Sequence, residues 1–145
     1  MMVSTKGRYA LRMLVDLAEH KDDGFIALKD IAQRQGISKK YLEQIVSILN
    51  SPEILKRNRG YQGGYMLAQP PQNYTVGYIL RITEGGLAPV SCLSTEEVNC
   101  ERASFCETLF VWEGLYKTIN EYLDSITLQD ILDRKNDNVS FDYMI

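Results

Sequence analysis

The connection Gln35-Gly36-Ile37-Ser38 constrains the fold of this 145-residue chain more than any other segment. It follows a short amphipathic pattern at residues 28–35. It precedes residues 42–49, where apolar side chains recur at i, i+3, i+4 and i+7. Ser38 is a favoured N-cap for the second pattern. Two amphipathic helices joined by a short turn that contains glycine predict a helix-turn-helix.

A glycine-rich, basic hairpin is expected directly after this unit. Two strand-like pieces, residues 54–59 and 65–67, flank the sequence Gly60-Tyr61-Gln62-Gly63-Gly64. A helix-turn-helix followed by such a hairpin is a winged helix, and Pro70-Pro71 marks its boundary. The sequence therefore predicts a winged helix-turn-helix DNA-binding domain at residues 1–70, mainly α with a small β-hairpin wing.

The remaining residues, 71–145, are expected to hold a cysteine-containing loop, a long dimerisation helix and the C-terminal tail. Residues 75–83 predict a helix that Gly85-Gly86 ends, and residues 87–103 lack periodicity. From Ser104 onward, apolar residues fall at steps of four and three, which is typical of a helix that pairs with a second copy. The same face could instead pack on the chain's own core. The seam residues are Phe105, Leu109, Trp112, Tyr116, Ile119 and Leu123.

Charge is divided unevenly along the chain, although its formal net value is only −3. Residues 1–66 carry eleven Lys and Arg against seven Asp and Glu, a balance of +4. Residues 67–145 carry five against twelve, a balance of −7. A basic front suits contact with an anionic polymer. Because no apolar run approaches a membrane span and no signal-peptide pattern is present, a cytoplasmic protein without membrane contact is expected.

Candidate DNA-contacting residues lie on the exposed face of the expected recognition helix and in the wing. Glu43 and Gln44 carry groups that can read cytosine and adenine edges in a major groove. Lysine and tyrosine side chains suit phosphate contacts, and Arg59 is placed to enter a narrow minor groove. A lysine pair at a helix start is by itself an ordinary solvated face, but the adjacent wing favours DNA binding. The full set is Ser38, Lys39, Lys40, Tyr41, Glu43, Gln44, Arg59, Gly60, Tyr61 and Gln62.

Four segments resemble the winged-helix regulators of the Rrf-two family, which has IscR-type and CymR-type members. They are residues 4–10 (STKGRYA), 35–38 (QGIS), 41–44 (YLEQ) and 59–65 (RGYQGGY). The resemblance covers almost the whole chain and implies a homodimer, held by the long C-terminal helix, on a partly palindromic operator in double-stranded DNA. It also implies that Glu43, Gln44 and Arg59 read bases or enter a groove, with Glu43 helping to discriminate operator classes.

Three cysteines, Cys92, Cys100 and Cys106, lie within fifteen residues and are the only ones in the chain. Thiolates bind zinc and iron–sulfur clusters, but the C-x7-C-x5-C spacing matches no standard motif and a fourth ligand is needed. By spacing alone, three partly buried and inert loop residues are the better interpretation. The resemblance to IscR-type members implies instead that the three cysteines hold a 2Fe–2S cluster.

The sequence departs from the IscR-type pattern around this loop. The first cysteine spacing is seven rather than five residues, and Leu109 stands where that pattern has a histidine. Arg8 occupies the place of an acidic ligand found in some relatives. The fourth ligand is therefore unknown, with Glu101, Glu107, another carboxylate, an exogenous thiol or water as open alternatives. Cys106 is expected within the first turn of the long helix.

The leading hypothesis is a dimeric transcriptional regulator, a repressor, whose operator binding responds to an iron–sulfur cluster and which controls cluster-assembly genes. The alternative is a CymR-like repressor of cysteine metabolism that acts in complex with cysteine synthase. A final short helix is expected at residues 128–132, followed by a polar tail that ends in Ile145 and resembles peptides that dock in that enzyme. A tail end without a partner is the plainer interpretation. A third hypothesis is an enzyme or a zinc-stabilised protein, although no nucleophile–base pair or phosphate loop supports an enzyme.

Overall fold

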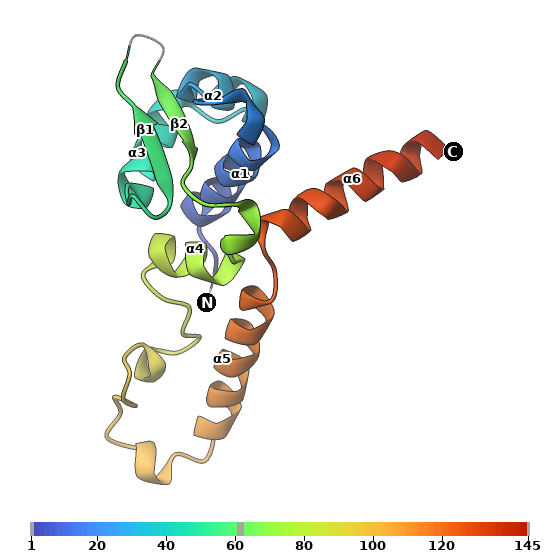
Figure 1. Ribbon diagram of the computed structural model, residues 1–145. Coiled ribbons are helices and arrows are strands. Elements are labelled where there is room, and N and C mark those ends of the chain that lie inside the picture. Colours follow the sequence, from blue (N-terminus) through green and yellow to red (C-terminus); the bar gives the residue numbers. More distant parts are fainter. Residues whose placement is uncertain (1, 61–62, 145) are drawn as a thin grey trace.

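The computed structural model describes residues 2–60 and 63–144, which form six α-helices and one two-stranded antiparallel hairpin (Figure 1). The main elements are α1 (Thr5–Glu19), α2 (Leu28–Gln35), α3 (Lys39–Leu49), β1 (Leu55–Asn58), β2 (Gly64–Leu67), α4 (Val76–Glu84), α5 (Leu109–Asp124) and α6 (Leu128–Met144). Short 3-10 turns are η1 (Lys21–Asp23), η2 (Pro71–Asn73), η3 (Ser91–Leu93) and η4 (Ala103–Phe105). The predicted fold class, a mainly helical winged helix-turn-helix followed by a long helix, is confirmed.

Local sequence sets the turn between α2 and α3. Gly36 ends α2 in the left-handed conformation, with φ of 65°, which costs glycine little. Ser38 then caps α3, because its hydroxyl oxygen accepts a hydrogen bond from the Tyr41 amide at 3.1 Å. The structure therefore confirms both the turn and the cap that the sequence predicts.

The hairpin is held against the segment that precedes α2. Tyr65 exchanges two backbone hydrogen bonds with Ile26, each 2.8 Å long. A β-carbon on Gly64 would lie 2.5 Å from the Ile26 carbonyl oxygen, so only glycine permits this approach. Tyr74 fixes the other end of the hairpin, since its buried hydroxyl donates to the Ile54 carbonyl oxygen at 2.7 Å.

A main core unites α1, α2, α3 and the hairpin with residues from later in the chain. Its fully buried members include Met13, Leu42 and Ile45, and it also contains Leu128 and Leu132 of α6. The start of α6 is tied to the start of α4 by the Val76–Ile126 and Leu128–Tyr74 backbone hydrogen bonds. The division into residues 1–70 and 71–145 stays a prediction.

A smaller core lies between α4 and α5. Val76, Leu80 and Leu87 are buried there, with partly buried side chains from α5 packed against them. Arg81 of α4 donates two hydrogen bonds to the Asp124 carboxylate, at 2.9 and 2.8 Å. This charged pair holds α5 along α4 and lowers the pKa of Asp124.

Two predicted helix boundaries are wrong. α5 begins at Leu109 rather than near Ser104, because the turn η4 occupies the residues before it. α6 extends to Met144, far beyond the predicted end at residue 132. Thr127 starts α6 as predicted, with reciprocal hydrogen bonds between Thr127 and Asp130. No glycine or proline follows to end the helix, so it propagates through the polar residues (Figure 1).

Over the described residues, no helix combines the length and the apolar character that crossing a membrane requires.

Candidate nucleic-acid interface

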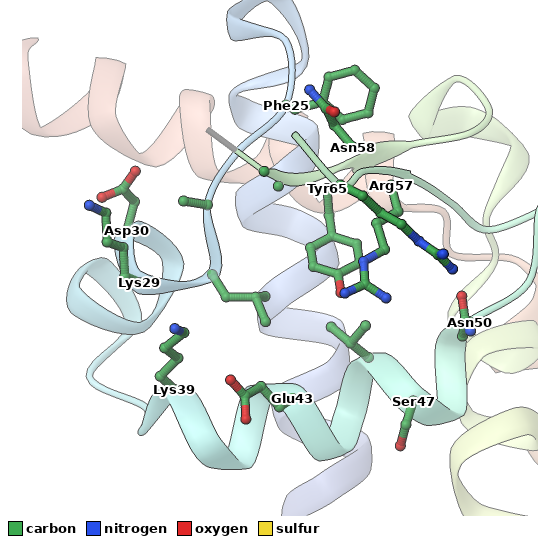
Figure 2. Close-up of a pocket in the computed structure, with 16 residues that line it drawn as sticks. Phe25, Lys29, Asp30, Lys39, Glu43, Ser47, Asn50, Arg57, Asn58 and Tyr65 are labelled. Carbon is green, nitrogen blue, oxygen red and sulfur yellow. The ribbon is translucent and has the colours of Figure 1, made fainter. Parts of the chain in front are cut away.

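An open groove of about 1150 Å³ lies between α3 and the hairpin (Figure 2). Figure 2 shows Glu43 projecting from α3, and Asn50 just after the end of that helix, on the side that faces β1 and β2. The charged residues that line the groove are four cations, Lys29, Lys39, Arg57 and Arg59, and two anions, Asp30 and Glu43. The groove is therefore net positive, as a surface that meets a polyanion should be.

The predicted DNA-contacting residues divide between this groove and the neighbouring exposed surface. Lys39, Glu43 and Arg59 line the groove. Lys40, Gln44 and Gly60 are exposed outside it, Ser38 caps α3, and Tyr41 is half-buried. Tyr61 and Gln62 lie outside the described residues. Contact of the whole set with DNA stays a prediction.

Arg57 is a candidate contact that the sequence interpretation missed. It pairs with Tyr65 across the hairpin, and its guanidinium lies 5.6 Å from the centroid of the Tyr65 ring. That stacking holds an exposed cation at the edge of the groove. The alternation of side chains along a strand could have revealed it, because Arg57 and Arg59 are two residues apart and share a face.

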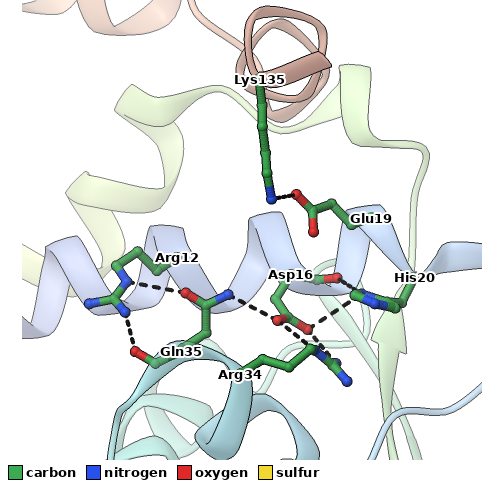
Figure 3. A network of polar contacts seen from close by, with 7 residues as sticks. All are labelled: Arg12, Asp16, Glu19, His20, Arg34, Gln35 and Lys135. Atoms are coloured by element: carbon green, nitrogen blue, oxygen red, sulfur yellow. Dashed lines mark hydrogen bonds and ion pairs between the residues drawn. The ribbon is translucent and has the colours of Figure 1, made fainter. Parts of the chain in front are cut away.

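A buried charged network fixes α1 against α2, and so positions the helix-turn-helix (Figure 3). The Asp16 side chain is 1% exposed and accepts hydrogen bonds from Arg34, at 3.0 and 2.6 Å, and from the Gln35 amide at 3.0 Å. Burial raises the pKa of Asp16, but the hydrogen bonds from Arg34 and Gln35 outweigh it, and the pKa lies below its ordinary value. The carboxylate therefore stays charged at neutral pH.

The three cysteines lie in the connection between α4 and α5, which has little regular structure. Cys92 is half-buried in η3, Cys100 is exposed, and Cys106 is half-buried just after η4. Within residues 2–60 and 63–144, no three side chains of His, Cys, Asp or Glu are grouped so that they could hold a metal ion. Thiols are suitable ligands for a cluster, but as they are placed they do not form its site.

Cys106 does not lie in the first turn of the long helix, as the sequence interpretation expected. It precedes the first residue of α5 by three positions, because Glu107 and Thr108 lie between them. Its thiol lies 3.6 Å from the Thr108 hydroxyl oxygen. This hydrogen bond, followed by one with the Thr108 backbone, lowers the pKa of the Cys106 thiol.

A family model described as an iron-dependent transcriptional regulator, Rrf2, matches residues 3–134. The chain belongs to the Rrf2 family. It is 39% identical over 131 residues to the HTH-type transcriptional regulator CymR of Bacillus subtilis. The aligned residues cover 90% of this chain and 89% of that protein. This confirms the resemblance on which the sequence interpretation relied.

This Rrf2 regulator is similar to solved structures of both types that the sequence resembles, CymR and IscR. The structure of CymR, the global cysteine regulator of B. subtilis, has a TM-score of 0.75 and 36% identity, covering 92% of this chain and 98% of that chain. The structure of T. potens IscR has a TM-score of 0.74 and 42% identity, covering 93% of this chain and 88% of that chain.

The predicted dimer seam of this Rrf2 regulator is divided between two environments. Tyr116, Ile119 and Leu123 are partly buried against the chain's own α4. Phe105 lies outside α5, in η4, while Leu109 and Trp112 are half-buried near the start of α5. The large apolar side chains that α5 exposes are instead Phe110, Val111, Leu115 and Tyr122. The spacing of apolar residues predicted an apolar face of α5 that here packs largely on α4. The apolar side chains that remain exposed lie on the neighbouring face of the same helix.

Proposed function

We propose that this Rrf2 regulator is a cytoplasmic repressor, without enzymatic activity, that binds a partly palindromic operator in duplex DNA as a homodimer. The observation that carries the proposal is the positive groove between α3 and the wing, lined by Lys39, Arg57 and Arg59. α3 is proposed to enter the major groove, and Arg59 the adjacent minor groove.

The exposed apolar side chains of α5 support the homodimer. Val111, Leu115 and Tyr122 lie at steps of four and seven residues, which places them on one face of the helix. Val111, Leu115 and Tyr122 are 43%, 43% and 64% exposed. Large apolar side chains gathered on one exposed helix face indicate a protein contact. The same face of a second copy is the proposed partner, because a two-fold dimer matches a palindromic operator.

Arg59→Ala is expected to weaken operator binding by about 1–3 kcal/mol, because the guanidinium would no longer enter the groove. The measurement is a fluorescence anisotropy titration at fixed salt, with a duplex that the wild-type protein selects from a randomised library. Arg134→Ala, which removes an exposed arginine from α6, is the matched control. Equal affinities for the two variants would exclude the wing from DNA recognition.

The response to a signal is proposed to reside in the cysteine loop, with two candidates. The three thiols favour an IscR-like protein with a 2Fe–2S cluster, for which the loop would have to change its present arrangement. The ungrouped placement of the cysteines favours a CymR-like repressor of cysteine metabolism that binds cysteine synthase. Ile145, through which that enzyme would be bound, lies outside the described residues. Full-length protein and a variant that lacks Ile145 would bind the enzyme equally if the tail is not involved.

Iron and sulfide are expected in the wild-type protein after anaerobic cluster reconstitution, with visible absorbance that each of Cys92→Ala, Cys100→Ala and Cys106→Ala reduces. Cysteine thiolates ligate the iron atoms of such a cluster, so each variant removes one ligand. The measurement is metal and sulfide analysis with visible spectra. A colourless wild-type protein would support the CymR-like candidate, whereas stoichiometric zinc would indicate a zinc-stabilised loop.

A further inference from the structure

The exposed face of α1 carries two arginines that the groove between α3 and the wing does not include. Arg8 and Arg12 are both exposed and stand four residues apart, so they lie one turn apart on the same face. No carboxylate of the described residues forms an ion pair with either guanidinium. Like charges at this spacing repel and slightly destabilise a helix, so an anionic partner would stabilise this face.

Direct contacts place Tyr9 and Arg12 of α1 beside the start of α3. The Tyr9 and Tyr41 rings meet edge to face, with centroids 5.7 Å apart. The Arg12 guanidinium lies 5.1 Å from the centroid of the Tyr9 ring. Arg12 also donates hydrogen bonds to the side chain and the backbone carbonyl oxygen of Gln35, the last residue of α2 (Figure 3). These contacts orient the guanidinium and leave further N–H donors free, since arginine has five.

α1 and the wing lie on opposite flanks of the recognition helix. At 3.6 residues per turn, Tyr41, which contacts α1, lies roughly 160° around the axis of α3 from Glu43, which faces the wing. The exposed side chains of Lys40, Gln44 and Ser47 lie on the arc between them. A helix that inserts this arc into a major groove has one phosphate backbone on each flank.

We infer that α1 is a second DNA contact, a clamp in which Arg8 and Arg12 bind backbone phosphates on the side of α3 opposite the wing. The inference rests on the proposed binding of duplex DNA by α3. Tyr9, through its contact with Tyr41, fixes the distance between this clamp and the recognition helix. Because phosphates carry no sequence information, the clamp contributes affinity and register without base specificity.

The test uses three variants. The first is a double variant with Arg8→Gln and Arg12→Gln, and the second carries Arg8→Gln alone. The third is a control double variant, Lys21→Gln and Lys117→Gln, which removes the same charge. The control lysines lie in η1 and α5 and are both exposed. Anisotropy titrations over a range of salt concentrations use the selected duplex and a scrambled duplex. Each lost phosphate contact should reduce the slope of log K against log salt by about 0.9. Because both subunits of the homodimer carry the substitutions, the double variant loses four contacts and about 3.6 of the slope. Affinity should fall by a similar factor on both duplexes.

Thermal unfolding separates a lost contact from a distorted fold, since Arg12 also holds Gln35. Arg8 has its hydrogen bond to Thr5 on its own helix, so Arg8→Gln should change the slope without changing the melting temperature. Arg8→Lys should retain the slope. Slopes equal to those of the control variant on both duplexes would overturn the clamp while leaving the proposed function intact. Absence of any selected sequence for the wild-type protein would instead refute the proposed function.

Discussion

Replacing Val111 and Leu115 together by aspartate is expected to produce a folded monomer whose operator affinity is lower by at least about 100-fold. Both side chains are exposed in the single chain, so the substitutions should leave the monomer core intact. In a dimer they would place four carboxylates in an apolar contact, where unpaired charges are strongly unfavourable. The loss in affinity follows because two linked half-site contacts gain about 10²–10⁴ over one.

Sedimentation velocity with far-UV circular dichroism measures this effect. Lys117→Glu changes the net charge by the same two units on the polar side of α5, and it should remain dimeric. Ile119 belongs to the predicted seam but packs on α4 of its own chain. Ile119→Asp should therefore lower the stability of the folded chain itself. A Val111→Asp, Leu115→Asp protein that sediments as a dimer would show that another surface forms the contact.

Arg34→Leu is expected to lower the free energy of unfolding by about 3 kcal/mol or more at pH 7, because it leaves the Asp16 carboxylate buried without its cation. Asp16→Leu should lower the free energy of unfolding by less. The Arg34 side chain that it leaves without its carboxylate is 36% exposed and can be hydrated. The double variant should recover part of the loss, as apolar replacements of buried pairs often do. Urea unfolding at one protein concentration measures all three, because a dimer's stability depends on concentration.

The effect of Arg34→Leu should depend on pH in a defined direction. In the wild-type protein the pKa of Asp16 is lowered from 3.8, so its contribution to stability is present above that pH. It is lost as the pH falls through the lower pKa of the folded state. In the variant, burial without the guanidinium raises the pKa of Asp16, so the difference between the two proteins should shrink as the pH falls through this raised pKa and then through the lowered pKa of the wild type. A difference independent of pH would indicate that packing, rather than charge, accounts for the loss.

The winged helix was predictable because its determinants are local. Gly36 and Ser38 act within one turn of the backbone, and the apolar spacing of α3 needs only its own residues. Sequence patterns also pointed to Lys39, Glu43 and Arg59, which line the groove, and contact of these residues with DNA stays a prediction. The patterns missed Arg57, whose place depends on hairpin register, and they placed Cys106 inside a helix that begins three residues later.

The sequence by itself determined which segments form helices and the hairpin, and the cap of α3 at Ser38, since backbone hydrogen bonding and side-chain period depend on near neighbours. Only the tertiary structure decided which face of α5 remains free, because Ile119 and Val111 are equally apolar and differ only in what lies beside them. It also decided how Arg12 meets Gln35, a contact between residues 23 positions apart. Such contacts depend on how helices pack, and the period of a single helix carries no information about its neighbour.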